Sequence, residues 1–313
     1  MKIVLLEDLA VRKERLEKER DILASRGHEF VWFERTADEG KLKDEAADAD
    51  VIMLANMPLS KEVLSAAKNL KYIDVAFTGV DHIPVKAALA RGIEISNASG
   101  YADDAVAELV MAEMIESLRR LPELQKRGKD GQAKTGIRGS LIKGKTVGII
   151  GAGHIGRRVA QLCKAFGCRV LGYNRSEITD PNFDGQTSLE NVLKESDIVS
   201  IHLPLTESTE HLIGKDELAL MKKGALLINT ARGKVVDEQA LVDVLNEDRI
   251  IACIDVYDKE PPLDEDDPIL TASNCILTPH IGFDSVDSME ARANIVFDNL
   301  YSWLDGTLKN AVH

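Results

Sequence analysis

The chain has 313 residues, of which 44% are hydrophobic, and its formal net charge at pH 7 is -13. That length usually corresponds to two domains, each with its own core. The negative charge repels nucleic acid and anionic membranes, so we expect neither as a partner and favour a small soluble molecule. An anionic ligand would need a few local bases or helix N-termini to hold it against this field.

The sequence contains four cysteines: Cys163, Cys168, Cys253 and Cys275. They form no Cys-x-x-Cys pair and no cysteine–histidine cluster with the spacing of metal ligands, which predicts a reducing compartment and no metal site. The N-terminal apolar run meets Glu7 and Asp8 too early for a signal peptide, and no run of 18 apolar residues occurs. We therefore expect a cytoplasmic protein.

Short β-branched or leucine-rich runs alternate with amphipathic stretches, a pattern typical of parallel strands joined by crossover helices. The sequence therefore predicts an α/β fold. In the first third, strands are expected at residues 2–6, 28–33, 50–54, 72–76 and 93–96. A charged stretch, residues 11–25, predicts a helix with a solvated face, which Gly27 ends.

A long helical pattern over residues 103–121 leads through a polar connector, residues 122–140, into a second series of strands. These are expected at residues 146–150, 169–173, 198–201, 225–229, 250–254 and 275–277. The bases of the connector indicate a solvated arm. A last helix, residues 285–304, has apolar or aromatic residues at steps of 3 or 4: Met289, Ala293, Val296, Leu300 and Trp303. Such a face needs a core to cover.

Gly151, Gly153 and Gly156 form the pattern G-x-G-x-x-G between a predicted strand and a predicted helix. Gly151 permits a tight turn, Gly153 lets the backbone approach a pyrophosphate, and Gly156 allows close packing of helix on strand. The helix N-terminus supplies amide donors and the positive end of a dipole. Three glycines can simply make a turn, but the flanking strands and helix favour a dinucleotide site.

The second strand of this unit runs into Asn174 and Arg175. At this place an acidic residue usually binds the ribose hydroxyls of NAD. Asn174 can bond a hydroxyl but has no charge that would repel a 2′-phosphate, and Arg175 offers a planar fork of donors suited to phosphate. The sequence thus favours NADP(H) over NAD(H). The alternative is that Asn174 serves NAD while Arg175 lies in solvent.

Four polar motifs follow the glycine loop: HLPLT (202–206), INTARGKVVDE (228–238), DVYDKEPP (255–262) and TPHIG (278–282). With them, the chain resembles the D-isomer-specific 2-hydroxyacid dehydrogenases, in particular glyoxylate and hydroxypyruvate reductases, over nearly its full length. The resemblance implies two Rossmann-like, doubly wound parallel-sheet domains with the active site in the cleft. A discontinuous, flavodoxin-like substrate domain would comprise residues 1–100 and 284–313, and a dinucleotide-binding domain residues 101–283.

The resemblance places Arg232, Glu260 and His280 at the positions of the family's catalytic arginine, acid and histidine. Reduction of a 2-oxo acid needs a cation that fixes the carboxylate and polarises the ketone, which suits the bidentate geometry of arginine. It also needs a proton donor, a role for a histidine beside a carboxylate. Singly, each residue could be structural, but together at successive strand ends they favour chemistry.

The loop AFTGVDHI, residues 76–83, is similar to the family's substrate loop, in which backbone N–H groups around Thr78 and Gly79 would hold the carboxylate. An ordinary strand-to-helix turn is the alternative. The resemblance also implies further cofactor contacts: Val106, His154, Ile155, Ser176, Leu203, Pro204, Thr206, Thr230, Ala231, Asp255 and Gly282. Among these, Val106 would back the nicotinamide and Asp255 would hold its carboxamide. We expect structural roles for His82 and His202.

Two features of the sequence reduce the range of expected substrates. Phosphoglycerate dehydrogenases usually have an arginine-rich substrate loop, where this chain has Phe77 and Thr78, and they often have an additional regulatory domain. Formate-specific relatives lack the glutamate found here as Glu260. We therefore expect glyoxylate, hydroxypyruvate or a similar small anionic 2-oxo acid, reduced to a D-2-hydroxy acid.

The resemblance further implies a homodimer through the linking helix and arm, residues 101–145. Two alternative functions remain open. One is a cofactor-sensing, corepressor-like protein of the same fold, against which the acidic balance and the intact catalytic trio argue. The other is a phosphite dehydrogenase, which shares the trio.

Overall fold

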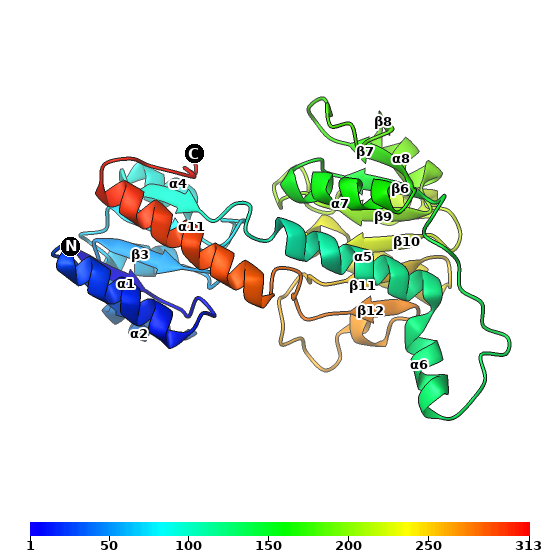
Figure 1. Cartoon of the computed structure of the whole chain (residues 1–313), viewed down its shortest axis with the longest axis horizontal. Coiled ribbons are helices and arrows are strands. Elements are labelled where there is room, and N and C mark those ends of the chain that lie inside the picture. The colour runs from blue at the N-terminus through cyan, green and yellow to red at the C-terminus, as the bar shows by residue number, and fades with distance from the viewer. The chain divides into compact units, whose positions relative to one another are not determined.

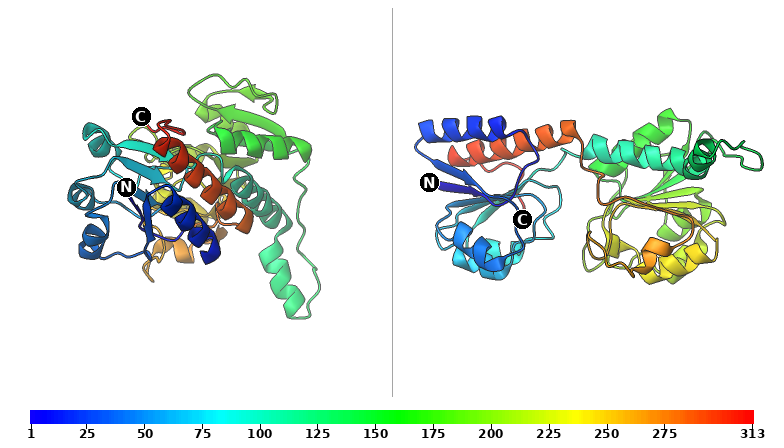
Figure 2. Two further views of the ribbon diagram at one scale, coloured as in Figure 1. Left: turned by 60° about the vertical axis from the view of Figure 1, so that its left-hand side comes forward. Right: turned by 90° about the horizontal axis from the view of Figure 1, so that it is seen from below.

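The computed structural model describes all residues, 1–313, and divides into two compact units (Figure 1). One unit comprises Met1–Ala102 and Asp284–His313, and the other comprises Asp103–Phe283. Each contains one parallel sheet with helices on both faces (Figure 2). The α/β fold expected from the sequence is confirmed. None of the helices is both long enough and apolar enough to span a membrane.

The first unit contains a five-stranded sheet with the order β2-β1-β3-β4-β5. Its strands are β1 Lys2–Leu5, β2 Glu29–Trp32, β3 Val51–Leu54, β4 Tyr72–Val75 and β5 Glu94–Asn97. Its helices are α1 Lys13–Ser25, α2 Glu39–Ala46, α3 Lys61–Ala66, α4 Val85–Ala90 and α11 Val286–Leu304. Every residue of β3 and β4 is buried, because helices cover both faces of the sheet, and this explains why Asp74 is the one charged residue in these two strands.

Helix α11 returns the end of the chain to the first unit. Four residues of its apolar face are buried: Met289, Ala293, Val296 and Leu300. Trp303 stacks on Tyr72 of β4 with 4.7 Å between ring centroids, and its indole N–H donates to Glu94 at 2.6 Å. The helix therefore completes the core of the unit that the N-terminal segment begins.

The second unit contains a seven-stranded sheet with the order β12-β11-β10-β9-β6-β7-β8. Its strands are β6 Thr146–Ile150, β7 Arg169–Tyr173, β8 Gly185–Gln186, β9 Ile198–Ile201, β10 Leu226–Asn229, β11 Ile251–Ile254 and β12 Cys275–Leu277. Its α-helices are α5 Asp103–Arg119, α6 Leu121–Lys129, α7 His154–Ala165, α8 Leu189–Glu195, α9 Lys215–Leu220 and α10 Glu238–Asn246, with 3₁₀ turns η1 Gly233–Val235 and η2 Pro268–Thr271. The strand order reverses at β6, which pairs with both β7 and β9. Ligands of doubly wound sheets bind at the carboxyl ends of the strands at such a point.

Two elements differ from the expectation. The polar connector contains helix α6, separated from α5 by Arg120, whose φ of 52° lies in the left-handed region. No residue of α6 is buried, so the helix has no core-facing pattern that would predict it. Strand β8 was not expected either, because its two residues are too few to show a period.

Candidate active site

The glycine-rich turn joins β6 to α7 at the point where the strand order reverses. Gly151 has a φ of 103°, and a Cβ there would lie 2.6 Å from the carbonyl oxygen of His202. A Cβ at Gly156 would lie 2.0 Å from the carbonyl oxygen of Gly151. Both positions therefore require glycine. Gly153 begins α7 in open space and no side chain caps the helix, so its first N–H groups suit a pyrophosphate.

Asn174 ties the end of β7 to this turn. Its side-chain oxygen accepts from the backbone N–H of Ala152 at 3.3 Å, and its amide donates to Ser176 Oγ at 2.9 Å. Gln186 of β8 donates to the carbonyl oxygens of Asn174 and Ser176, both at 3.0 Å. Arg175 is exposed and makes no hydrogen bond or ion pair with the chain. The loop thus presents an amide and a guanidinium where a carboxylate is usual.

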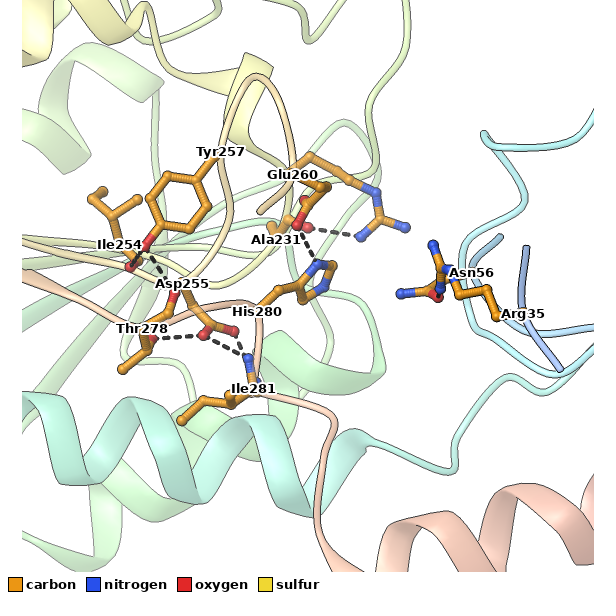
Figure 3. Close-up of polar contacts among 12 residues, drawn as sticks. Arg35, Asn56, Ala231, Ile254, Asp255, Tyr257, Glu260, Thr278, His280 and Ile281 are labelled. Carbon is orange, nitrogen blue, oxygen red and sulfur yellow. Dashed lines mark hydrogen bonds and ion pairs between the residues drawn. The ribbon is translucent and has the colours of Figure 1, made fainter. Parts of the chain in front are cut away.

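His280 and Glu260 meet from the loops that follow β12 and β11. The Nδ1 atom of His280 lies 2.8 Å from a carboxylate oxygen of Glu260 (Figure 3). An ionised carboxylate only accepts, so Nδ1 carries the proton of this bond and Nε2 is the nitrogen that faces other partners. The side chain of His280 is 17% exposed, and Phe283 meets its ring edge-on with 5.3 Å between centroids. The imidazole is therefore oriented but still accessible.

The backbone of His280 has a φ of 57°, a conformation that residues other than glycine seldom adopt. Asp255, directly after β11, holds this loop. One of its oxygens accepts from the Thr278 hydroxyl at 2.6 Å and from the Ile281 N–H at 2.8 Å, and the other accepts from the Gly282 N–H at 2.8 Å (Figure 3 draws the contacts to Thr278 and Ile281). These three bonds fix the turn that carries the catalytic candidate.

Asp255 is fully buried, and burial raises the pKa of its carboxyl group while its three donors oppose the rise. Glu113 on α5 is also buried and neither carboxyl oxygen has a hydrogen-bond partner. Burial raises the pKa of Glu113 to about 8, and the charge of Asp255 adds to the rise. The loop of His280 is thus held by one buried carboxyl group with a second one near it. Nothing in the helical pattern around Glu113 distinguished it.

Arg232 lies between β10 and η1, and its Nη1 donates to the carbonyl oxygen of Ala231 at 2.7 Å. Asn229, the last residue of β10, shapes this turn by accepting from the Ala231 N–H at 3.1 Å and donating to the Arg232 carbonyl at 2.9 Å. A Cβ at Gly233 would lie 2.0 Å from the carbonyl carbon of Tyr257, so glycine lets the two loops touch. Asn229 stands within the INTARGKVVDE motif but was not expected to act.

The three catalytic candidates follow the adjacent strands β10, β11 and β12, and the carboxyl ends of parallel strands share one edge of the sheet. The edge therefore carries the guanidinium of Arg232 and the ring of His280, whose Nδ1 atom is hydrogen-bonded to the carboxylate of Glu260. Such groups can bind a carboxylate or carbonyl oxygen and transfer a proton to it.

Most other residues that the resemblance assigned to the cofactor lie at the same edge. His154 and Ile155 begin α7, Leu203, Pro204 and Thr206 follow β9, Thr230 and Ala231 follow β10, and Gly282 follows β12, while Val106 lies in α5. The hydroxyl of Thr230 is buried without a hydrogen-bond partner, which a bound molecule would supply. His202 has a different character, since burial lowers its pKa to about 3 and its ring is neutral at pH 7.

In the first unit, the expected substrate loop follows β4. The carbonyl oxygen of Thr78 accepts from the Asn97 side chain at 2.8 Å, while its hydroxyl is buried without a partner. Gly79 follows directly. An unpaired buried hydroxyl is costly, so a polar ligand at this loop would be stabilising. No group of three or more His, Cys, Asp or Glu side chains has the arrangement of a metal site.

Comparison with known proteins decides the family. The model of the D-isomer specific 2-hydroxyacid dehydrogenase, NAD binding domain, matches residues 111–282. The chain is also 37% identical to the glyoxylate reductase of Korarchaeum cryptofilum over 279 residues, which cover 86% of this chain and 82% of the relative. This chain belongs to the D-isomer-specific 2-hydroxyacid dehydrogenase family. The resemblance expected from the motifs is confirmed, and the second unit of this dehydrogenase-family protein contains the NAD-binding domain.

Two further proteins are similar to this chain. The D-3-phosphoglycerate dehydrogenase of Methanocaldococcus jannaschii is 36% identical over 279 residues, 87% of this chain. The match covers 53% of that protein, so the chain spans about half its length. A solved structure of an acyclic imino acid reductase in complex with NADPH and D-Arg superposes with a TM-score of 0.91 at 29% identity, covering 100% of both chains.

Proposed function

We propose that this member of the family reduces a small 2-oxo acid, such as glyoxylate or hydroxypyruvate, to its D-2-hydroxy acid with NADPH in preference to NADH. The observation that carries the proposal is the 2.8 Å contact between His280 Nδ1 and Glu260, on the sheet edge that also carries Arg232. The name of the glyoxylate reductase relative supports the same substrate class.

Each residue of the trio has a role in this reaction. Arg232 binds the substrate carboxylate and polarises the ketone. The backbone N–H groups around Thr78 and Gly79 are the proposed carboxylate donors of the substrate loop. His280 donates a proton from Nε2 to the ketone oxygen, and Glu260 keeps Nδ1 in place and stabilises the protonated ring. When bound, the reduced nicotinamide supplies the hydride to the ketone carbon. In the oxidation direction His280 accepts the proton.

The cofactor preference rests on the adenosine end of the site. Arg175 is exposed without a partner, beside the amide of Asn174, so it can bond a 2′-phosphate that no nearby carboxylate of the strand end repels. The uncapped N-terminus of α7 would hold the pyrophosphate. Asp255 would bond the carboxamide with its remaining acceptor capacity. The NADPH bound to the imino acid reductase supports the fit of this cofactor to the fold.

We also propose that the protein is a cytoplasmic homodimer assembled through residues 101–145. Two observations support the interface. Helix α6 buries none of its residues within the chain, and Leu141 is 68% exposed. An exposed apolar side chain and a helix that buries no residue within its own chain are both typical of surfaces that a second subunit covers.

The test is the loss of absorbance at the reduced-nicotinamide band with NADPH and NADH in parallel, against glyoxylate, hydroxypyruvate, pyruvate and bulkier 2-oxo acids. Rapid loss of NADPH with at least one acid is the expected result. Tight binding of NADPH without turnover of any acid would instead indicate a cofactor sensor, and reduction of NADP driven by phosphite would indicate a phosphite dehydrogenase.

A further inference from the structure

Arg35 lies at the carboxyl edge of the sheet in the first unit and has no part in the mechanism above. Its Nη1 donates to the side-chain oxygen of Asn56 at 2.6 Å and lies 3.1 Å from a carboxylate oxygen of Glu7 (Figure 3 shows Arg35 and Asn56). Glu7, Arg35 and Asn56 follow β1, β2 and β3, which are neighbours in the order β2-β1-β3. Three loops therefore meet through these side chains.

Glu7 fixes both the loop after β3 and the direction of Arg35. Its side chain is buried, and its second oxygen accepts from the backbone N–H groups of Ala55 and Met57, both at 2.7 Å. A buried carboxylate needs a counter-charge and donors on its lone pairs, and Arg35 supplies the charge. The guanidinium is consequently held in one orientation before any ligand arrives.

Arg35 and Asn56 then present only donors to their surroundings. Because arginine has no acceptor, Asn56 must turn its oxygen toward Arg35 and its NH₂ group away. The Nε and Nη2 atoms of Arg35 and the NH₂ of Asn56 make no hydrogen bond within the chain, and the Arg35 side chain is 54% exposed. An accessible, oriented set of donors on a cation matches an anion with several acceptor oxygens, above all a carboxylate.

The place of these donors relates them to the substrate. Thr78 and Gly79, which would hold the carboxylate of the 2-oxo acid, follow β4, the direct neighbour of β3. Neighbouring strands lie about 4.8 Å apart, so the ends of β3 and β4, which carry these two loops, are about one strand spacing apart. A similar distance separates the two carboxylates of a short 2-oxo diacid. Arg35 follows β2, two places beyond β3 in the sheet, and its side chain reaches the loop after β3 through its hydrogen bond to Asn56.

We propose that Arg35 and Asn56 form a second anion-recognition site and that the preferred substrate is a 2-oxo acid with a second carboxylate beyond its ketone. This inference rests on the proposed function, since it adds a selectivity to the same reaction. Because the whole chain carries a charge of -13, a dianionic substrate needs such a local set of donors to be captured. The charge of Glu7 offsets that of Arg35, so the selectivity comes from directed hydrogen bonds.

The experiment compares kcat/KM within two pairs of acids of similar shape. Oxaloacetate is paired with 4-methyl-2-oxopentanoate, and 2-oxoglutarate with 5-methyl-2-oxohexanoate, so that an isopropyl group replaces the second carboxylate. The wild-type protein should favour at least one diacid over its partner by about 10-fold to 100-fold, the effect of hydrogen bonds to a charged group. Arg35→Gln should remove most of this preference and leave the monoacids within about twofold of wild type.

Two further variants separate recognition from loop support. Arg35→Lys keeps a cation beside Glu7 but lacks the planar fork, so it should fold normally and still lose part of the preference for diacids. Arg20→Gln removes an exposed arginine on α1, 47% exposed at its side chain, and should change neither class of substrate.

The possible results are distinguishable. Equal losses with diacids and monoacids in Arg35→Gln would mean that Arg35 only supports the loop, and would overturn the inference. A wild-type protein that reduces monoacids at least as well as diacids would overturn it too, while leaving the proposed function intact. Failure to reduce any of these four acids, with glyoxylate or hydroxypyruvate still reduced, would overturn this inference alone. Failure to reduce glyoxylate and hydroxypyruvate as well would refute the proposed function and this inference together.

Discussion

The Thr278 hydroxyl donates to the buried carboxylate of Asp255 at 2.6 Å, two residues before the strained backbone of His280. Through this contact Asp255, at the end of β11, helps to position the loop that carries His280, the proposed proton donor. A hydrogen bond to a charged group contributes about 1.5–3 kcal/mol. Removing this hydrogen bond should therefore change both the melting temperature of the protein and the rate of the reaction.

Thr278→Val tests whether this hydrogen bond helps to position His280. We expect a lower melting temperature and a kcat reduced by about 10-fold or more, because a small misplacement of a reacting group is costly. The KM for NADPH should change little. Thr271→Val, which alters an exposed threonine in η2, is the matched control. A variant with normal kcat would show that the other bonds to Asp255 hold the loop without Thr278.

His280→Asn tests the proton donor itself. Asparagine can keep a hydrogen bond to Glu260 but cannot donate a proton to a ketone oxygen, so kcat/KM for reduction should fall by about 10²-fold to 10⁴-fold. The dissociation constant for NADPH, measured by nicotinamide fluorescence, should stay within about twofold because the ring is assigned to substrate chemistry. Near-normal turnover would remove His280 from the mechanism.

Arg175→Ala tests the cofactor preference. Losing the fork that bonds the 2′-phosphate should raise the KM for NADPH by about 10-fold to 100-fold and leave that for NADH nearly unchanged. Arg169→Ala, at the other end of β7, removes an exposed ion pair with Glu195 and serves as the control. If Arg175→Ala changes the KM values for NADPH and NADH equally, Arg175 does not bind the 2′-phosphate.

Glu113→Gln tests the buried carboxyl group on α5. Its pKa is raised from 4.5 to about 8 in the folded protein, so between these values the folded state keeps a proton that the unfolded state releases. The wild type therefore loses stability as pH rises through this window, and the loss is complete above the folded pKa. Glutamine has no such proton, so the variant should melt at least about 2 °C higher near pH 8. The difference should shrink toward pH 5, and a constant difference across the range would contradict ionisation as the cause.

The strands were predictable because a parallel sheet covered on both faces requires predominantly apolar runs. Strands β6, β7, β9 and β12 have the predicted bounds, and the other predicted strands differ by one residue at one or both ends. Helix α6 and strand β8 were missed for the opposite reason, since one buries nothing and the other is too short to show a period.

Local sequence also indicated where chemistry would occur, because glycines and polar residues directly after apolar strands are adjacent along the chain. Arg232, Glu260 and His280 could be named in this way with the help of the family motifs. Their supports could not. Asn229 and Gln186 are single residues at strand ends or within a very short strand, and no spacing distinguishes them from other polar residues.

The α/β class, most strands, the glycine turn and the family could be predicted from the amino-acid sequence, because these depend on residues close together in the chain. Three relationships became visible in the folded chain alone: Asp255 holds the loop of His280, Glu113 is buried near Asp255, and Glu7 and Asn56 orient Arg35. The residues joined by these contacts are far apart in the chain: Arg35 and Asn56 are separated by 21 positions, and Arg35 and Glu7 by 28. The physical reason is that strand order in the sheet, and not position in the chain, sets which loops meet.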